Sequence, residues 1–483
     1  PHTMKISVLL FTIATAGFAA LPAVGPNYAR PTTPAPAAYR DAENSPAWAT
    51  AAPADALPRG EWWKLFADPT LDDLESRALA GNQDLRAAAA RVEQARAVAG
   101  AARGAYWPQI AANGSVVRER TSTTTDNVFP DALTTTYRAP LEAAWEIDLF
   151  GRVRRLNESA RAEAAASAAT FAGERLALTA EVASTYFSLR GFEQELSLVR
   201  ETVALRRRAL QLVTARVKSG TAADLDSARA ETELATAEAE AAALANRRES
   251  LQNALAVLTG VPASDFSAGQ LSVASGGVVS QRALEAIPPS IPAGLPSELL
   301  ERRPDIVAAE NALASANARI GVAKAAFFPA ISLTGSAGYA SGDIDRLTNA
   351  DSRIWSVGPR LYLPIFQGGR NRANLERSRA AYDEAVAEFR QRVLVAFREV
   401  QDALTATRLL AEQAAALDRA TAAARRATSL AQTRYDAGYV SYLEVIDAQR
   451  TALASERLAT QLGAQRLNTS VALIQLLGGG WHP

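Results

Sequence analysis

The residues that could carry covalent or metal chemistry are nearly absent from this chain. It has no cysteine, and its two histidines, His2 and His482, lie at opposite ends of 483 residues. Disulfides, cysteine-based metal sites, cysteine nucleophiles and histidine-centred triads are therefore excluded or disfavoured. The carboxylates are scattered at helix-surface spacings and form no constellation, so we expect no enzyme, no cofactor and no metal site.

One pair of carboxylates is notable for its spacing. Glu444 and Asp447 lie three residues apart in RYDAGYVSYLEVIDAQR, residues 434–450, and would share one face of a helix. Ser441 to Glu444 also reads as a capping box, and acids in a first turn offset the helix dipole. A looser copy of the stretch, RVKSGTAADLDSARAET, occupies residues 216–232. We therefore ask what element the chain makes twice.

The two copies belong to an internal duplication of the whole chain. Matching residues recur 221 positions apart in the first part of each half and 218 positions apart in the second part. The aligned pairs are Asp84 with Asp305, Gly100 with Gly321, Pro108 with Pro329, Arg216 with Arg434, Gly220 with Gly438, Leu225 with Leu443, Ala230 with Ala448, Glu238 with Glu456 and Gly260 with Gly478. Each half is predicted to be a helix, a β-hairpin, a very long helix, a tight turn and a shorter helix.

Proline placement predicts the long helices. No proline falls between Leu141 and Val261 or between Ile365 and His482, and both stretches are rich in Ala, Leu, Arg and Glu. A continuous helix from Arg152 to Val217 would be about 100 Å long. Its apolar residues recur at spacings of three, four and seven, which is typical of a helix packed laterally against others.

Two predicted hairpins precede these helices. LEAAWEIDLF, residues 141–150, alternates apolar and charged residues with the period of a strand, and its predicted partner is residues 109–120 across a polar loop at 121–135. The second half repeats this with residues 330–341 and 354–366, although Pro359 and Pro364 weaken the last strand. Either these are membrane strands, with Trp107, Phe327 and Phe328 as interfacial aromatics, or they are surface hairpins of a soluble protein. The duplication in an exported chain favours membrane strands.

The N-terminus predicts export. Met4 is the only methionine, and Lys5 precedes an apolar run too short to span a bilayer but typical of a secretory signal. No later stretch has the length of a membrane helix, so any membrane portion would be β. The 51 basic and 51 acidic residues balance, so we expect no nucleic-acid partner.

Oligomerisation follows from the strand count. Four strands cannot enclose a pore, and unpaired strand edges are costly in hydrocarbon. Three chains would supply 12 strands and a matching set of helices, which would form a wide barrel continuing into a helical tube.

The chain resembles the outer membrane factor family of TolC-like exit ducts, in particular the OprM/NodT-type branch that serves resistance-nodulation-division pumps. The resemblance covers essentially the whole chain and is carried by four motifs: AVGPNYARP (23–31), WWKLFADPTLDDL (62–74), LPSELLERRPDI (295–306) and YLEVIDAQR (442–450). It implies a mixed, mostly α-helical fold: a homotrimer with a 12-stranded outer-membrane barrel in outer-membrane lipid, a periplasmic α-helical barrel and an equatorial domain. It also implies a periplasmic adaptor and an inner-membrane pump as partners.

The expected organisation follows the repeat. A signal peptide covers 1–21, with 1–3 preceding the natural start. The remaining segments are an extended segment (22–60), first-repeat helices (61–107), hairpin 1 (108–150), long helical hairpin 1 (151–261), an equatorial segment (262–303), a second-repeat helix (304–328), hairpin 2 (329–366), long helical hairpin 2 (367–478) and a tail (479–483).

The resemblance also assigns roles to residues at the two helical turns. It implies a periplasmic gate at Asp447 and Glu444, with Glu444 equally readable as a helix cap. It implies gate latches at Tyr435 and Asp226, with Arg434 and Arg216 as cationic candidates. Gly220, Gly438 and Lys218 would form adaptor-docking tips, although two glycines in such places are commonly C-caps and Lys218 also suits a solvated helix end. Members of this branch usually carry a lipid-attachment cysteine just before the AVGP motif. Pro22 occupies that position in this chain, so no lipidation site is expected.

The sequence is also compatible with two other functions. One is a TolC-like exit channel for protein secretion, which physical argument alone does not separate from drug efflux. The other is a trimeric autotransporter-type adhesin, whose strands would lie at the C-terminus rather than in duplicated internal hairpins.

Overall fold

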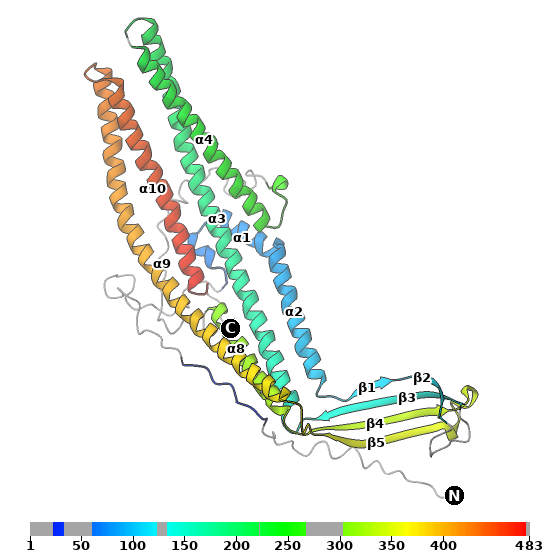
Figure 1. The fold of residues 1–483 in the computed structure, drawn as a ribbon. Helices are drawn as coiled ribbons and strands as arrows, with labels where there is room; N and C mark the ends of the chain where they lie inside the picture. The colour runs from blue at the N-terminus through cyan, green and yellow to red at the C-terminus, as the bar shows by residue number, and fades with distance from the viewer. Residues whose placement is uncertain (1–22, 33–59, 123–132, 222, 267–302, 480–483) are drawn as a thin grey trace. The chain divides into compact units, whose positions relative to one another are not determined.

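The computed structural model describes residues 23–32, 60–122, 133–221, 223–266 and 303–479 (Figure 1). It divides into two compact units. Of the described residues, unit 1 contains 23–32, 91–122, 133–168 and 308–389, and unit 2 contains the others. The predicted signal peptide and Pro22 lie outside the described residues, as do most of the extended segment and of the equatorial segment.

The helices reproduce the internal repeat residue for residue. Helices α2 (Gln83–Gly104) and α8 (Pro304–Ala325) have 22 residues each. Helices α3 (Arg152–Lys218) and α9 (Arg370–Asp436) have 67 each, and α4 (Asp224–Leu258) and α10 (Tyr442–Leu476) have 35 each. The long helices expected from the proline-free stretches are thus confirmed. Among the described residues, no helix combines the length and apolarity needed to cross a membrane.

The strands of unit 1 form one antiparallel sheet. Its strands are β1 (Gln109–Ala112), β2 (Ser115–Arg120), β3 (Leu133–Ile147), β4 (Ala330–Ser341) and β5 (Arg353–Tyr362). The order is β1–β3–β4–β5, and β2 also pairs with β3. Among the described residues, β1 with β2 forms one edge of this sheet and β5 forms the other.

The single strand predicted at residues 109–120 was wrong in one respect, because it is divided into β1 and β2. Both pieces keep the same register on β3, with Ala112 opposite Leu141 and Ser115 opposite Arg138. The two residues of β3 that face the gap are Ala139 and Pro140, and Pro140 has no backbone N–H. Only one bond therefore forms there, from the Asn113 N–H to the Pro140 carbonyl at 3.0 Å.

The strand boundaries next to the predicted loops also differ from expectation. Strand β3 begins at Leu133, inside the segment expected to be loop, and residues 123–132 of that segment are outside the described residues. Strand β5 ends at Tyr362 instead of Phe366, before Pro364. Pro359 interrupts no pairing within the described sheet, because β5 pairs there on one side only. Two short 3₁₀ turns, Ile344–Arg346 and Ala350–Ser352, lie between β4 and β5.

The N-terminal segment at residues 23–32, the strap, is bound along unit 1. Arg155 donates to the side-chain oxygen of Asn27 at 2.7 Å, and Asn317 donates to the Pro26 carbonyl at 3.0 Å. The Tyr28 hydroxyl donates to Glu310 at 3.3 Å. Gly25 has a φ of +103°, and a Cβ there would lie 2.5 Å from the Cα of Gly321. The strap therefore needs glycine at both places.

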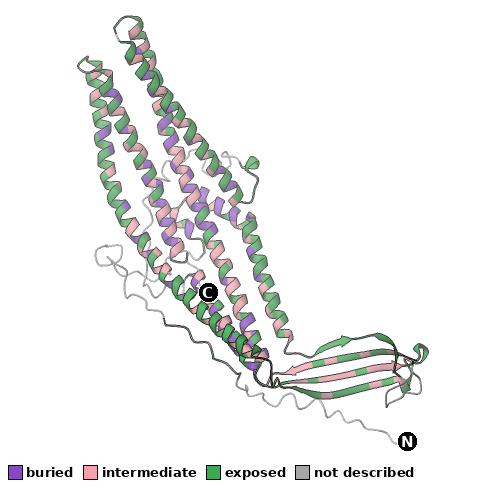
Figure 2. Ribbon diagram, viewed as in Figure 1, coloured by how far each residue is buried: buried purple, intermediate pink, exposed green. Residues whose placement is uncertain are grey.

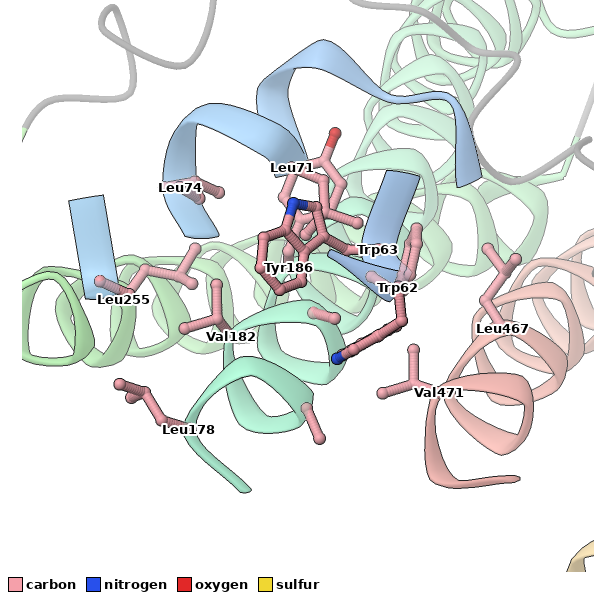
Figure 3. Close-up of a cluster of buried hydrophobic side chains, with 14 of the residues drawn as sticks. Trp62, Trp63, Leu71, Leu74, Leu178, Val182, Tyr186, Leu255, Leu467 and Val471 are labelled. Atoms are coloured by element: carbon pink, nitrogen blue, oxygen red, sulfur yellow. The ribbon is translucent and has the colours of Figure 1, made fainter. Parts of the chain in front are cut away.

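Unit 2 holds the main hydrophobic core (Figure 3). The 3₁₀ turn Trp62–Phe66 and helix α1 (Pro69–Gly81) place their apolar residues against α3, α4 and α10. Trp62 is 1% exposed and donates to the Thr179 hydroxyl at 3.1 Å. Asp68 caps α1 and also accepts a hydrogen bond from the Tyr186 hydroxyl at 2.7 Å. The WWKLFADPTLDDL motif thus supplies core residues that pack between the helices.

Candidate functional site

The two turns between the long helices are built alike. After α3 the Gly220 N–H donates to the Val217 carbonyl and the Thr221 N–H to the Arg216 carbonyl, both at 2.9 Å, and the turn after α9 repeats this pattern around Gly438. Gly220 and Gly438 have φ values of +72° and +80°. This is the Schellman arrangement, which favours glycine because other residues are strained at positive φ.

The first helical hairpin, α3 with α4, touches the second, α9 with α10, close to these turns. Arg216 donates to the Tyr435 hydroxyl at 2.6 Å, and its guanidinium carbon lies 5.2 Å from the centre of that ring. The Tyr435 ring in turn packs on Tyr442, with centroids 5.4 Å apart. Burial raises the pKa of the Tyr442 hydroxyl, and the neighbouring Tyr435 raises it further.

The other three residues named as latches or tip cations are placed differently. Asp226 lies 4.0 Å from Arg229 on its own helix and makes no contact with the second hairpin in the part of the chain that the structure describes. Within that part, the side chains of Arg434 and Lys218 make no hydrogen bond or ion pair either. Of the four named latches, the structure brings together Arg216 and Tyr435.

Glu444 and Asp447 both lie on the exposed side of the first turns of α10. The residues between them, Val445 and Ile446, are buried at 0% and 6% exposure. Among the described residues, neither carboxylate accepts a hydrogen bond or forms an ion pair. The predicted capping box is wrong, because the Ser441 side chain makes no capping bond and only its carbonyl accepts the Glu444 N–H, at 3.2 Å.

The repeat supplies an internal comparison for this pair. The equivalent positions in the first hairpin, 218 residues earlier, hold Asp226 and Arg229, whose charges offset each other. The second hairpin instead presents two acids at the same spacing. The first hairpin carries a second acid at Asp224 in the same turn, so the two hairpins differ in where their acids lie.

A buried carboxylate joins three helices below the turns. Glu233 of α4 is 7% exposed, and Arg206 of α3 holds it through a 2.9 Å ion pair and a 2.7 Å hydrogen bond to its carbonyl. Arg450 of α10 donates to the other carboxylate oxygen. This bond and the Glu233 charge raise the pKa of Arg450, which keeps the guanidinium charged. Glu233 thereby links the first hairpin to the second.

A second link of the same kind lies further along α10. Arg457 forms a 2.7 Å ion pair with Glu195 of α3 and also contacts Glu240 of α4. Glu195 is 1% exposed and accepts a further bond from Gln461 at 3.1 Å. Beyond it, Asn468 donates to the Ser188 hydroxyl at 3.0 Å. The three contacts through Glu233, Glu195 and Ser188 are here called the inter-hairpin ladder.

The ladder residues are not among those predicted from the motifs, although the repeat contains a signal for them. Contacts within a hairpin are repeated: Arg207 pairs with Glu238 at 2.7 Å, and Arg425 pairs with Glu456 at 2.5 Å. The ladder charges have no charged counterpart, since Glu233 and Arg450 align with Thr451 and Thr232, and Glu195 aligns with Gln413. Charges that break the repeat are candidates for contacts between its two halves.

One face of the sheet is apolar and exposed. Residues directly opposite each other in a ladder project from the same side, so Leu141, Ala337 and Trp355 share a face, as do Ala143, Gly335 and Val357. Leu141, Trp355 and Val357 are 56%, 78% and 67% exposed. The opposite face carries Glu142, Ser336 and Ser356 in register, and Figure 2 shows that none of the described strand residues is buried. Exposed apolar area of this extent marks an interaction surface.

The interfacial aromatics named from the sequence divide into two kinds. Trp107 and Phe327 are 70% and 43% exposed at the ends of the strands. Phe328 instead stacks on Phe150, with ring centroids 4.8 Å apart.

Comparison with known proteins places the chain among characterised transport components. A model of the outer membrane efflux protein family matches residues 74–261 and 295–479. The chain is 36% identical over 430 residues to the solvent efflux pump outer membrane protein SrpC of Pseudomonas putida, covering 89% of this chain and 88% of the relative. It is 33% identical over 460 residues to the cation efflux system protein CusC of Escherichia coli O6:H1, covering 95% and 96%.

A solved structure agrees with these matches. That of the outer-membrane channel OprN has a TM-score of 0.83 and 33% sequence identity, and the match covers 95% of this chain and 100% of that one.

Proposed function

Because the chain belongs to the outer membrane efflux protein family, with its TolC-like, mostly helical fold, we propose that it is the outer-membrane exit duct of a tripartite efflux pump. It conducts drugs and other small molecules passively from a periplasmic adaptor and a resistance-nodulation-division inner-membrane pump to the exterior. It resides in the outer membrane of a Gram-negative bacterium and extends into the periplasm. It performs no catalysis and uses no cofactor.

The observation that carries this proposal is the sheet of unit 1. Its apolar face is exposed in the single chain, and β1 with β2 and β5 each pair on one side only among the described residues. The apolar face can contact lipid. The backbone N–H and C=O groups at the unpaired strand edges would cost about several kcal/mol each in hydrocarbon. Pairing β5 of one copy with β1 and β2 of the next satisfies both edges. Three copies, each with four strand positions, close a 12-stranded barrel around an aqueous lumen.

Glu444 and Asp447 form the gate in this proposal. Both are exposed, and neither is offset by a basic partner within 4 Å among the described residues. Three copies bring six carboxylates around one axis, where they repel each other and attract cations. The Asp226 and Arg229 pair at the equivalent positions of the first hairpin supports this assignment, because it shows that the spacing alone does not demand two acids.

Weak contacts between the hairpins latch the gate closed. The Arg216–Tyr435 contact lies at the turns, and the ladder bonds through Arg450 and Arg457 lie below them. The Arg450 side chain is 60% exposed, so its pair with Glu233 is worth about 0 to 1 kcal/mol. This weak pair and the Arg216–Tyr435 contact hold the closed state, yet a bound partner can outcompete them. Arg434 and Asp226 are kept as latch residues on the resemblance alone, because among the described residues neither side chain forms a hydrogen bond or ion pair with the other hairpin.

The turns themselves dock the periplasmic adaptor. Gly220, Gly438 and Lys218 mark them, and two pairs of repeat-related leucines leave apolar surface on both hairpins. Leu212 and Leu430 are 50% and 56% exposed, and Leu225 and Leu443 are 58% and 51% exposed. Because exposed leucines lie at equivalent positions on each hairpin, an adaptor has two similar binding surfaces per chain.

Planar-bilayer recording tests the gate assignment. We expect Asp447→Ala, and more strongly Asp447→Ala with Glu444→Ala, to raise single-channel conductance and lower cation preference. Asp224→Ala is the matched control, since it removes an exposed acid from the first turn of the equivalent helix α4. Unchanged conductance and selectivity in the double variant, or an equal change in the control, would remove Glu444 and Asp447 from the gate.

A further inference from the structure

A groove of about 350 Å³ lies between α9 and α10, within unit 2. Its volume is in the range of small-molecule sites, which runs from roughly 300 to 1,000 Å³. Its lining includes three leucines and three glutamines: Leu417, Leu458, Leu462, Gln413, Gln461 and Gln465. None of the described residues that line it is charged.

Several positions around the groove have smaller side chains than their counterparts in the first hairpin. The equivalent region of the first hairpin is filled by a buried cluster of Leu196, Val199 and Leu244 with Phe192 packed against it. In the second hairpin, 218 residues later, Leu196 is replaced by Ala414.

Two positions of the lining show the same reduction. Leu198 and Thr202 of the first hairpin correspond to Ala416 and Ala420, and both alanines line the groove. Leu417 and Gln461 are larger than their counterparts Val199 and Ala243, so the loss of side-chain volume in the lining is confined to positions 416, 420 and 465.

The same comparison explains why the groove is neutral. Three charged residues of the first hairpin, Glu195, Glu240 and Arg247, correspond to Gln413, Leu458 and Gln465 in the groove. In the first hairpin both acids are ion-paired with Arg457. The second hairpin has no charge at these three positions and has amides at two of them, Gln413 and Gln465. The groove therefore offers both apolar contact and neutral hydrogen bonding.

One amide of the lining is already oriented. The Gln461 Nε2 donates to Glu195 at 3.1 Å, so its carbonyl oxygen remains to accept a hydrogen bond from a guest. Among the described residues, the side chains of Gln413 and Gln465 make no hydrogen bond and can donate or accept. A charged guest would lose hydration without gaining an opposite charge.

We propose that this groove binds small uncharged molecules that combine an apolar ring with a hydroxyl group. The ring packs on Leu417, Leu458 and Leu462, and the hydroxyl donates to the Gln461 oxygen. This site lies in the wall of the second hairpin and is separate from the acidic pair at Glu444 and Asp447. Its occupancy needs neither an adaptor nor a pump.

Fluorine NMR titration of the full chain in detergent with 4-fluorophenol tests the proposal. Ala416→Leu restores the leucine of the first hairpin and fills the groove, so we expect binding at least about fivefold weaker than in the unsubstituted chain. Ala422→Leu is the matched control, because Ala422 is exposed and points about 200° around α9 from Ala420. It should bind 4-fluorophenol as the unsubstituted chain does. Both changes keep a strong helix former, so the fold is retained.

The charge of the guest gives a second criterion. We expect 4-fluorobenzoate to bind at least about fivefold more weakly than 4-fluorophenol, since the lining has no cation. Equal binding of the phenol to the unsubstituted chain and to Ala416→Leu would overturn the proposal, as would equal binding of the two guests. Because the titration measures no conductance, its failure leaves the duct and gate to be judged by their own recordings.

Discussion

Arg450→Ala should shift the channel towards its open state. The Arg450 side chain is 60% exposed, whereas its partner Glu233 is 9% exposed and keeps its bonds to Arg206 after the substitution. The substitution leaves Glu233 paired with Arg206, so no buried charge loses its only partner. The free energy lost is therefore that of one ion pair with an exposed arginine, about 0.5 kcal/mol. In a ring of three copies that opens as a unit, the loss sums to about 1.5 kcal/mol, or roughly tenfold in the closed-to-open equilibrium.

The assay is single-channel recording in a planar bilayer, with open probability as the measured quantity. Arg425→Ala is the control, because it breaks the Arg425–Glu456 pair, which has a 64% exposed arginine and joins α9 to α10 inside one hairpin. We expect a roughly tenfold rise in the open-to-closed ratio for Arg450→Ala and no rise for the control. An unchanged open probability, or the same rise in both variants, would refute the role of the ladder as a latch.

Two further predictions concern stability and the strap. Burial raises the pKa of Glu75 to about 9 from its usual 4.5, so the folded chain keeps a proton that the unfolded chain loses. The free energy of unfolding should therefore fall as pH rises between these values, by up to about 1.4 kcal/mol per pH unit, and Glu75→Gln should flatten the slope in urea unfolding from pH 5 to 9; identical slopes would contradict this. Gly25→Ala should displace the strap, because its Cβ would lie 2.5 Å from the Cα of Gly321, and should speed chymotrypsin cleavage after Tyr28. Gly114→Ala, which meets open space, should not, and equal cleavage rates in both variants would count against the strap contact.

The large elements were predictable because their causes are local. The absence of proline between Leu141 and Val261, together with the Ala, Leu, Arg and Glu content of that stretch, predicts long helices, and α3 ends at Lys218, a residue beyond the predicted end. The repeat was also readable, since glycine at positions such as Gly220 and Gly438 is fixed by positive φ in a turn.

The details that were missed depend on contacts between distant segments. The division of β1 from β2 is caused by Pro140, a residue on another strand. The sequence of residues 109–120 alone therefore does not predict it. The capping box failed for a similar reason, because a favourable Ser441 and Glu444 spacing does not fix the Ser441 rotamer. The Glu233–Arg450 link joins residues 217 positions apart, so only a comparison of the two halves could have suggested it.

For the gate residues, the positions could be predicted from the sequence, but the role could not. The motif placed Glu444 and Asp447 on one helix face, and the structure has both exposed at the start of α10. Their role depends on what neighbouring copies bring to the axis, which one chain does not contain.

The mass of the purified, detergent-solubilised particle tests the central claim most directly. A chain with four strand positions must share a pore wall with identical copies. Native mass spectrometry should therefore give a stable particle of three times the mass of the chain. A particle that remains a single chain under the same conditions would contradict the account.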